Sequence, residues 1–190
     1  MSLEKAPSEK RLRQVEVATL GGGCFWCIEA GFSEVNGVTR VESGYSGGQL
    51  QNPTYEQVST GTTGHAEVVQ VTFDPDVVSF REVLEIFFAM HDPTTLNRQG
   101  SDVGTQYRSL VLYHTREQRA SAKRFIKELT DANASDAAIV TQVEPFKAFY
   151  RAEDYHKDYF RHHADQPYCK MAIAPKIAKL RKKYREKLKK

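Results

Sequence analysis

The sequence predicts a single α+β domain, in which helices pack on a mixed, mainly antiparallel sheet. Strand and helix patterns intermingle along the chain, with long loops between them and no internal repeat. The length of 190 residues suits one domain with a sizeable core. With 40% hydrophobic and 27% charged residues, the composition is that of a globular protein.

The first quarter of the chain contains two strand patterns on either side of a helix start. Residues 15–20 are predicted as a strand, and the glycines at 21–23 break it. Residues 24–33 follow as a helix that ends near the Asn-Gly pair at 36–37. Residues 38–45 are the second extended segment.

Residues 67–73 alternate clearly between two faces of a strand. One face carries the apolar side chains together with the first residue of the segment: Glu67, Val69, Val71 and Phe73. Because the apolar face is expected to be buried, parity alone predicts that Glu67 points toward the core. The alternative is a Glu at the strand end that faces solvent.

Two helices and two short strands are predicted in the second half of the chain. Capping-box patterns open helices at 79–90 and 115–129, and strands are expected at 110–113 and 139–143. We expect a sheet of roughly four to six strands, arranged as a two-layer sandwich with a ferredoxin-like core. Residues 91–108 lack periodicity, and a loop of this length in a compact domain is usually functional or disordered. Their Asp, Thr, Gln and Tyr content favours a functional loop.

Positive charge is concentrated at the C-terminal end. Residues 176–190 carry a net charge of +8, so the rest of the chain carries −5 against a total of +3. An apolar stripe within them predicts a basic amphipathic helix that packs on the domain: Ile177, Leu180, Tyr184 and Leu188. We therefore divide the chain into a flexible segment at 1–14, a domain at 15–175 and this helix. A nucleic-acid or acidic partner for the helix is the alternative.

Two of the three cysteines form a Cys-x-x-Cys motif after the glycine turn. Cys24 would lie at a helix N-terminus, where backbone N–H groups and the helix dipole favour a reactive thiolate. Cys27 would lie one turn further on, close enough for a disulfide after a modest adjustment. The alternative is that both cysteines are small buried hydrophobic residues.

The neighbours of Cys24 suggest what it attacks. Phe25 and Trp26 suit a small apolar group such as an S-methyl, although both rings could equally be core. A sulfoxide oxygen leaves only when it is protonated, and a buried Glu67 is a suitable acid because desolvation raises a carboxyl pKa. Tyr45 and Tyr107 are candidate donors to the same oxygen, although each alone could be a packing residue.

Five short segments resemble, in order, the signatures of the peptide-methionine (S)-S-oxide reductase family. They read Gly-Cys-Phe-Trp-Cys at 23–27, Gly-Tyr-Ser-Gly-Gly at 44–48 and Gly-His-Ala-Glu-Val at 64–68. Asp-Val-Gly-Thr-Gln-Tyr-Arg-Ser at 102–109 and Glu-Asp-Tyr-His at 153–156 complete the set. The resemblance covers roughly residues 15 to 170, and five matches in order make it specific.

The resemblance implies a role for each matched residue. Cys24 would attack the sulfoxide sulfur, Phe25 and Trp26 would hold the methyl group, and Glu67 would protonate the oxygen with help from Tyr45 and Tyr107. Asp102 and His156 match family positions around the site. The family acts on the S epimer of free or protein-bound methionine sulfoxide, repairs oxidised proteins and uses no metal or bound organic cofactor. Cys24 would end as a sulfenic acid.

A second thiol must then condense with that sulfenic acid. Cys169 looks like the C-terminal resolving cysteine of many family members, and it would reach Cys24 on a mobile loop segment. Cys27 is already one turn away, so the choice stays open, with Cys169 slightly favoured as the first resolver. Thioredoxin, or dithiothreitol in vitro, would reduce the disulfide. Many relatives end in a glycine-rich tail, whereas this chain continues into the basic helix.

Three alternatives use the same residues differently. A general thiol–disulfide oxidoreductase would use the Cys-x-x-Cys motif but leave the aromatic pair and Glu67 without a role. A zinc module would need Cys24 and Cys27 to join a His and Cys cluster far along the chain: His162, His163 and Cys169. A nucleic-acid binder would depend on the basic tail, but the acidic remainder of the chain argues against it.

The sequence also predicts where the protein works. Its first residues lack the apolar stretch of a secretory signal, and no apolar run is long enough to span a membrane. An odd number of cysteines argues against a disulfide framework and for a reducing compartment. We therefore expect a cytoplasmic protein without a membrane partner.

Overall fold

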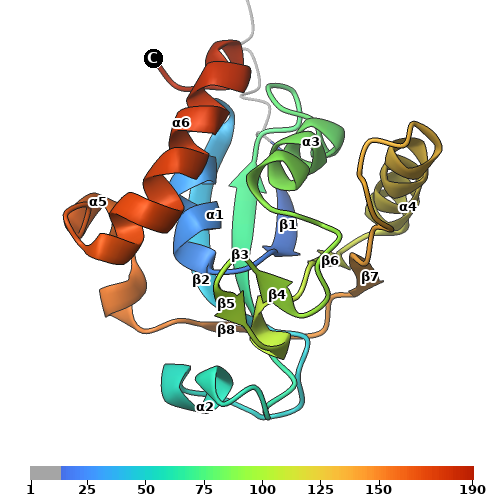
Figure 1. The fold of residues 1–190 in the computed structure, drawn as a ribbon. Helices are drawn as coiled ribbons and strands as arrows, with labels where there is room; N and C mark the ends of the chain where they lie inside the picture. Colours follow the sequence, from blue (N-terminus) through green and yellow to red (C-terminus); the bar gives the residue numbers. More distant parts are fainter. Residues whose placement is uncertain (1–13) are drawn as a thin grey trace, which may run out of the picture.

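The computed structural model describes residues 14–190, which form one sheet-and-helix unit (Figure 1). The flexible segment predicted at 1–14 lies outside the described residues, apart from Gln14. The sheet has six strands in the order β7-β6-β1-β3-β2-β8. In chain order these are β1 (Glu16–Gly21), β2 (Val38–Ser46), β3 (Ala66–Phe73), β6 (Leu110–Tyr113), β7 (Gln142–Pro145) and β8 (Phe149–Arg151). Every pairing is antiparallel except β6 with β7, so the predicted mainly antiparallel mixed sheet is confirmed.

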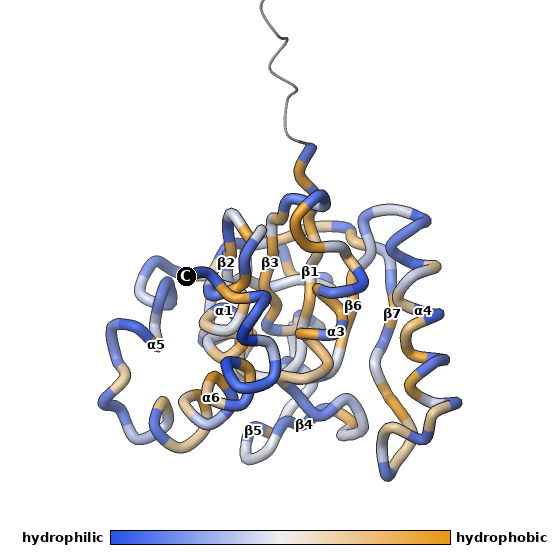
Figure 2. The backbone as a smooth tube through the Cα atoms, turned by 90° about the horizontal axis from the view of Figure 1, so that it is seen from above, coloured by the Kyte–Doolittle hydropathy of each residue, from blue (hydrophilic) through white to orange (hydrophobic). Residues whose placement is uncertain are grey.

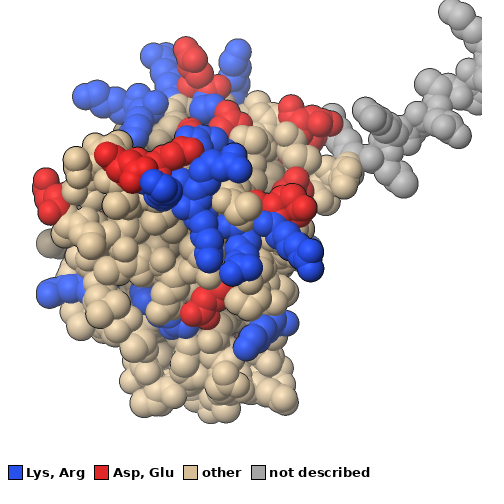
Figure 3. Space-filling view, turned by 90° about the vertical axis from the view of Figure 1, so that its right-hand side faces the viewer, with Lys and Arg blue, Asp and Glu red and all other residues tan. Residues whose placement is uncertain are grey.

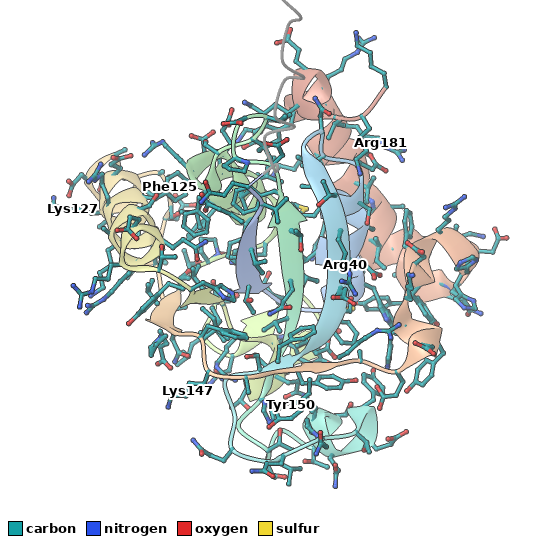
Figure 4. The ribbon with its side chains drawn as sticks, turned by 180° about the vertical axis from the view of Figure 1, so that it is seen from behind. Arg40, Phe125, Lys127, Lys147, Tyr150 and Arg181 are labelled. Carbon is teal, nitrogen blue, oxygen red and sulfur yellow. The ribbon has the colours of Figure 1, made fainter. Side chains whose placement is uncertain are left out.

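Helices cover one face of this sheet. The longer ones are α1 (Phe25–Ser33), α3 (Phe80–Met90), α4 (Arg116–Asp131) and α6 (Ala174–Lys183). Seen from the front, α1, α3 and α6 lie before the sheet, whereas the view from behind looks onto its other face (Figures 1 and 4). The central four strands have the order β6-β1-β3-β2. Along the chain, α1 follows β1 and α3 follows β3. Whether this core is best described as ferredoxin-like stays a prediction.

The core lies between the sheet and these helices. It contains the helix-facing side chains of β3, which are Val69, Val71 and Phe73, packed with Ile28 of α1 and Phe87 of α3. Their alternation along β3 is the pattern that the sequence showed. The hydrophobic colouring is strongest in the central strands, whereas α5 (Tyr159–His162) and the C-terminal end are mostly hydrophilic (Figure 2).

The sheet is curled rather than flat. Strands β7 and β8 stand at opposite ends of the strand order, yet only residues 146–148 connect them. A flat sheet would separate its edge strands by roughly 24 Å, whereas four peptide steps reach at most about 15 Å. The two edges must therefore approach each other at this end of the sheet, where Phe146 and Phe149 pack on Ala66 and Val68.

The basic tail is part of the folded unit. Ile177 and Leu180 are each 2% exposed, and Tyr184 and Leu188 pack against the core, so the predicted apolar stripe is confirmed. Arg181 makes two hydrogen bonds to the Glu34 carboxylate, of 2.9 and 2.6 Å. The predicted helix bounds of 176–190 were wrong: a π-helical turn (Cys169–Ile173) leads directly into α6, which ends at Lys183, and Leu188 lies beyond it in an extended conformation.

Several predicted boundaries were wrong. The strand expected at 139–143 is β7 (Gln142–Pro145), because its parallel pairing with β6 sets its limits. The second capping box is incomplete: Thr115 accepts from the Gln118 N–H, but the Gln118 side chain accepts from His114 N–H instead. The helix α2 (Tyr55–Ser59), which has a full capping box, and the strand β8 were not predicted.

The unpatterned stretch 91–108 is ordered by short elements. It contains a two-stranded ribbon of β4 (Arg98–Gln99) and β5 (Asp102–Val103), followed by the 3₁₀ turn η1 (Thr105–Tyr107). A second 3₁₀ turn, η2 (Asp154–His156), precedes α5, and a third, η4 (Arg185–Lys187), follows α6. Within residues 14–190, none of the helices has the length and apolar character needed to cross a bilayer.

Candidate active site

The turn between β1 and α1 positions Cys24. Gly23 has φ +92°, a left-handed conformation that favours glycine. A Cβ atom there would lie 2.7 Å from Cβ of Gln99, so the turn also needs the missing side chain. Cys24 is the N-cap residue of α1, and only 7% of it is exposed. The predicted glycine turn and helix start are therefore confirmed.

The three cysteines are free thiols in one buried cluster. Cys24, Cys27 and Cys169 pack together with Ile173 and Ile177. The Cys24 and Cys27 side chains are hydrogen-bonded to each other. The thiol whose charge acts on Cys169 is Cys27. Cys27 therefore interacts with both of the other thiols.

Burial dominates the acidity of these thiols. It raises the pKa of Cys24 well above its ordinary value, and the hydrogen bond with Cys27 and the charge of Glu67 add to the rise. The hydrogen bond with Cys24 lowers the pKa of Cys27. Burial thus opposes the Cys24 thiolate that a helix N-terminus favours, and the thiolate stays a prediction.

Glu67, a residue of β3, places a buried carboxyl beside the start of α1. It is 2% exposed, and its Oε2 accepts a hydrogen bond of 3.0 Å from the Phe25 N–H. Burial raises the pKa of Glu67 to about 8, although the Phe25 hydrogen bond opposes the rise. The core-facing orientation predicted from strand parity is confirmed, and the solvent-facing alternative is wrong. A carboxylic acid thus stays protonated at neutral pH beside the Cys24 turn.

Tyr45 and Tyr107 both approach Glu67, but their hydroxyl groups differ. Tyr45 pairs with Glu67 across β2 and β3, is 0% exposed and donates a hydrogen bond of 2.7 Å to Glu153 Oε2. Burial raises the pKa of Tyr107, with the charges of Glu67 and Cys24 adding to it. Among residues 14–190 no hydrogen bond engages the Tyr107 hydroxyl, which leaves it free to donate to a ligand.

Phe25 and Trp26 have different surroundings. Phe25 is 0% exposed and belongs to the main core, so its ring is a packing residue in this structure. Trp26 is half-buried and stacks on Tyr159 with ring centroids 3.7 Å apart and an interplanar angle of 7°. Its Nε1 donates a hydrogen bond of 3.0 Å to His156 Nδ1. Burial lowers the pKa of His156, which keeps this imidazole neutral as the acceptor.

Asp102 meets the thiols through Tyr168. The Tyr168 hydroxyl donates a hydrogen bond of 2.7 Å to Asp102 Oδ2 and also interacts with the Cys24 and Cys27 thiols. Its ring stands edge-on to Trp26, with centroids 5.9 Å apart. Tyr168 therefore links Asp102 and Trp26 to the thiols.

Cys169 does not lie on a mobile loop, as the sequence had suggested. It is the first residue of the π-helical turn before α6, it is 0% exposed, and it already packs in the thiol cluster. The prediction was wrong because Pro167 suggested a loop, whereas the helical segment that follows packs on α1. No long loop movement is needed to bring Cys169 into contact with another thiol.

Four further residues complete the site, and the sequence analysis did not select them: Tyr55, Glu153, Tyr159 and Tyr168. The Glu153 carboxylate accepts from the Tyr45 hydroxyl and, at 2.8 Å, from the Tyr55 N–H. Burial raises the pKa of Tyr55 to about 12. Two signals were present: Glu153 begins one of the family-like segments, and Tyr168 directly precedes Cys169.

The zinc alternative is not assembled here. His162 and His163 are exposed on and after α5, whereas the three cysteines are buried. Throughout the described part of the chain, residues 14–190, no three His, Cys, Asp or Glu side chains are arranged to hold a metal ion.

Comparison with known proteins identifies relatives of this chain. The family model described as peptide methionine sulfoxide reductase matches residues 16–188. The protein named peptide methionine sulfoxide reductase MsrA of Saccharolobus solfataricus is 57% identical over 175 residues, covering 92% of this chain and 98% of that protein. The MsrA of Sulfolobus acidocaldarius is 58% identical over 173 residues, covering 91% and 97%.

Solved structures share the fold. Reduced Mxr1 from Saccharomyces cerevisiae superposes with a TM-score of 0.74 and 33% identity, covering 82% of this chain and 89% of that chain. Mxr1 has also been solved in complex with Trx2, and in that form the similarity is a TM-score of 0.53 at 23% identity.

Proposed function

The chain belongs to the peptide methionine sulfoxide reductase family, and from that premise we propose that it reduces the S epimer of methionine sulfoxide, free or in proteins, through Cys24. One observation carries this proposal: a carboxyl whose pKa is raised to about 8, Glu67, is hydrogen-bonded to the first residue of the helix that Cys24 caps. The site therefore offers a thiol nucleophile and a protonated acid at one point.

In the first step the Cys24 sulfur attacks the sulfoxide sulfur while the Glu67 carboxyl protonates the oxygen. The oxygen passes to Cys24, methionine leaves as a thioether, and the thiol becomes a sulfenic acid. The proton of the Cys24 thiol replaces the one that Glu67 donated, so the step is balanced. Tyr107, whose hydroxyl is free, is the better placed second donor, and the Tyr45 hydroxyl acts once it leaves Glu153.

Three residues around Trp26 shape the methyl pocket. Stacking on Tyr159 and the hydrogen bond to His156 hold the indole in one orientation, which supports its role as the wall that contacts the S-methyl group. Phe25 supports that wall from the core side. Asp102 positions Tyr168 beside the thiols.

The contacts of the thiols support Cys27 as the first resolver. The Cys27 thiol attacks the Cys24 sulfenic sulfur, the oxygen leaves as water, and a Cys24–Cys27 disulfide forms. The Cys169 thiol then attacks Cys27, which releases Cys24 as a thiol and leaves a Cys27–Cys169 disulfide. This order reverses the slight preference that the sequence suggested. Thioredoxin is proposed as the reductant in a reducing, cytoplasmic compartment, without a resident metal or cofactor.

The order of the thiols can be tested by mass spectrometry after one turnover. In a Cys169→Ser variant, one equivalent of substrate should produce a Cys24–Cys27 disulfide as fast as methionine appears. In a Cys27→Ser variant, a direct Cys24–Cys169 disulfide should form more slowly. Equal rates in the two variants would argue for independent resolvers.

The activity itself is tested with the separate S and R epimers of a methionine sulfoxide peptide and dithiothreitol as reductant. Wild type should reduce only the S epimer, and Cys24→Ser should reduce neither. Turnover of a disulfide substrate without sulfoxide reduction would instead support the general thiol–disulfide oxidoreductase alternative. Loss of activity on deletion of the basic tail, with the cysteines dispensable, would support the nucleic-acid alternative.

A further inference from the structure

A groove with one cationic wall runs between α3, α4 and α6. Its volume is about 870 Å³, and its apolar floor includes Phe88 and Met90 of α3 and Phe125 and Leu129 of α4. Phe125 points from α4 toward α3, whereas Lys127 points away from it (Figure 4). Neither Trp26 nor the tyrosines around Cys24 line this groove.

The wall formed by α6 carries a row of lysines. Lys176, Lys179 and Lys183 line the groove at helical spacing along one side of α6. No carboxylate within residues 14–190 forms an ion pair with any of them; Lys183 lies over the Tyr184 ring at 5.1 Å. The two carboxylates that also line the groove are already engaged, Glu85 with Arg81 at 3.3 Å and Asp92 with the Thr94 hydroxyl at 2.6 Å.

The outer surface of α4 also carries positive charge, whereas the α4 residues that line the groove are the apolar Phe125 and Leu129. Figure 3 looks onto the side of the molecule that carries α4, and Lys and Arg side chains gather there in one band. The exposed cations of α4 are Arg116, Arg119, Lys123, Arg124 and Lys127. An apolar floor beside a row of lysines is complementary to a protein surface that combines apolar and acidic side chains. The net charge of −5 on residues 1–175 opposes a nucleic acid as the occupant.

One end of the groove lies near the thiols, because the charge of Lys176 acts on both Cys27 and His91. The helix that carries the lysines follows directly from the turn that begins at Cys169. At the same end, Gln99 and His91 line the groove and also touch the glycine turn before Cys24, since a Cβ at Gly22 would lie 2.9 Å from the His91 ring. A protein seated in the groove would therefore stand next to the segments that hold the resolving and attacking cysteines.

We propose that this groove is the docking surface for the protein that returns electrons to the enzyme, a thiol–disulfide reductase with an acidic surface beside its own two thiols. The inference rests on the proposed function, since a Cys27–Cys169 disulfide is what this partner opens. One donor thiolate attacks Cys169, and Cys27 leaves as a thiol. The second donor thiol then releases Cys169, so the donor ends as a disulfide and two electrons reach the enzyme.

The test compares a protein reductant with dithiothreitol in charge-reversal variants. Lys179→Glu/Lys183→Glu reverses two groove lysines; Lys176 is kept because its charge acts on Cys27. Lys182→Glu/Arg185→Glu is the matched control, because it makes the same change of charge at exposed positions outside the groove. Activity on the S epimer is measured with thioredoxin and, separately, with dithiothreitol at increasing salt. Lys179→Glu alone is included because Lys183 contacts Tyr184.

The groove variant should lose about tenfold or more in kcat/KM for thioredoxin at low salt, with a flatter salt dependence and dithiothreitol activity within about twofold of wild type. The control variant should stay near wild type in both assays. Equal losses in the groove and control variants, or no loss in either, would overturn the proposal. So would tight binding of a single-stranded oligonucleotide that only the groove variant loses. Absence of dithiothreitol activity in wild type would instead contradict the proposed function.

Discussion

Two buried carboxyls lie along helix α1. Glu67, a residue of β3, lies near the beginning of the helix, and Glu29 lies in its middle. Their surroundings differ. Glu67 contacts the first residue, and its pKa is raised to about 8. Glu29, a residue of α1 itself, is 4% exposed, and burial followed by the charge of Asp158 raises its pKa to about 7. Glu29 faces Ser43 and the Asp158 N–H beside a cavity of about 350 Å³.

A raised pKa does not by itself mark a catalytic acid, and we expect only one of these two carboxyls to act as one. Both groups are desolvated, and burial keeps both protonated to a much higher pH than an ordinary carboxyl. Only Glu67 acts electrostatically on Cys24 and on Tyr107. Glu29 lies five residues after Cys24, along a helix that rises about 1.5 Å per residue. No thiol is among the groups that shift the pKa of Glu29. We infer that proximity to Cys24 selects the acid.

The largest expected effect separates the two carboxyls directly. Glu67→Gln should lower kcat for the S epimer by about 10²–10⁴-fold, because the variant cannot protonate the leaving oxygen. Glu29→Gln is the matched control and should stay within about twofold of wild type. Thermal unfolding of both variants checks that each folds. A comparable loss in Glu29→Gln would contradict the distinction between the two sites.

The pH dependence should follow Glu67 and ignore Glu29. Methionine formation in a single turnover of pre-reduced enzyme should slow as the pH rises through about 8, because the acid form of Glu67 is then lost. A single turnover avoids the pH dependence of the external thiol. Glu29→Gln should retain this alkaline limb. If the limb moved in Glu29→Gln, the group that titrates in the rate would not be Glu67.

A smaller effect should distinguish the two tyrosines. Tyr107→Phe should lower kcat by about 10–100-fold, because it removes a free hydroxyl donor. Tyr45→Phe should cost less, since its proton is engaged with Glu153 before substrate binds. Steady-state rates with the S epimer and dithiothreitol measure both. A larger loss in Tyr45→Phe would show that Tyr45 turns from Glu153 toward the sulfoxide.

The smallest effect concerns stability. The pKa of Glu29 is about 7 in the fold against an ordinary value of 4.5, so the native state binds more protons between these values. Stability is therefore lost as the pH rises through this window. The Gln side chain cannot ionise. The free energy of unfolding of Glu29→Gln, relative to that of wild type, should therefore be roughly 1–3 kcal/mol higher at pH 8 than at pH 5. Urea unfolding at both pH values measures it, and a gain that is equal at both would contradict this assignment.

The sequence predicted the region around Glu67 better than the region around Cys169, for a physical reason. The orientation of Glu67 depends on strand parity, and the position of Cys24 depends on a glycine turn before a helix; both signals are local. The placement of Cys169, Tyr168 and Glu153 depends on contacts between residues far apart in the chain. No periodicity in their own segments encodes those contacts.

The same division applies to the fold. Strongly periodic segments such as β3 and α3 were predicted to within about two residues, which is the usual precision of helix and strand boundaries. The limits of β7 and the existence of β8 depend on edge pairing with β6 and β2, and the curl that brings those edges together is a property of the whole sheet.

The central claim, that Cys24 takes the oxygen, is tested most directly by trapping the product on the enzyme. In a Cys27→Ser/Cys169→Ser variant no thiol can resolve the sulfenic acid, so one equivalent of S epimer should give one methionine and one dimedone adduct on Cys24 per protein. The account predicts that the R epimer gives neither product. Methionine formation without an adduct on Cys24, or an adduct on another residue, would contradict it.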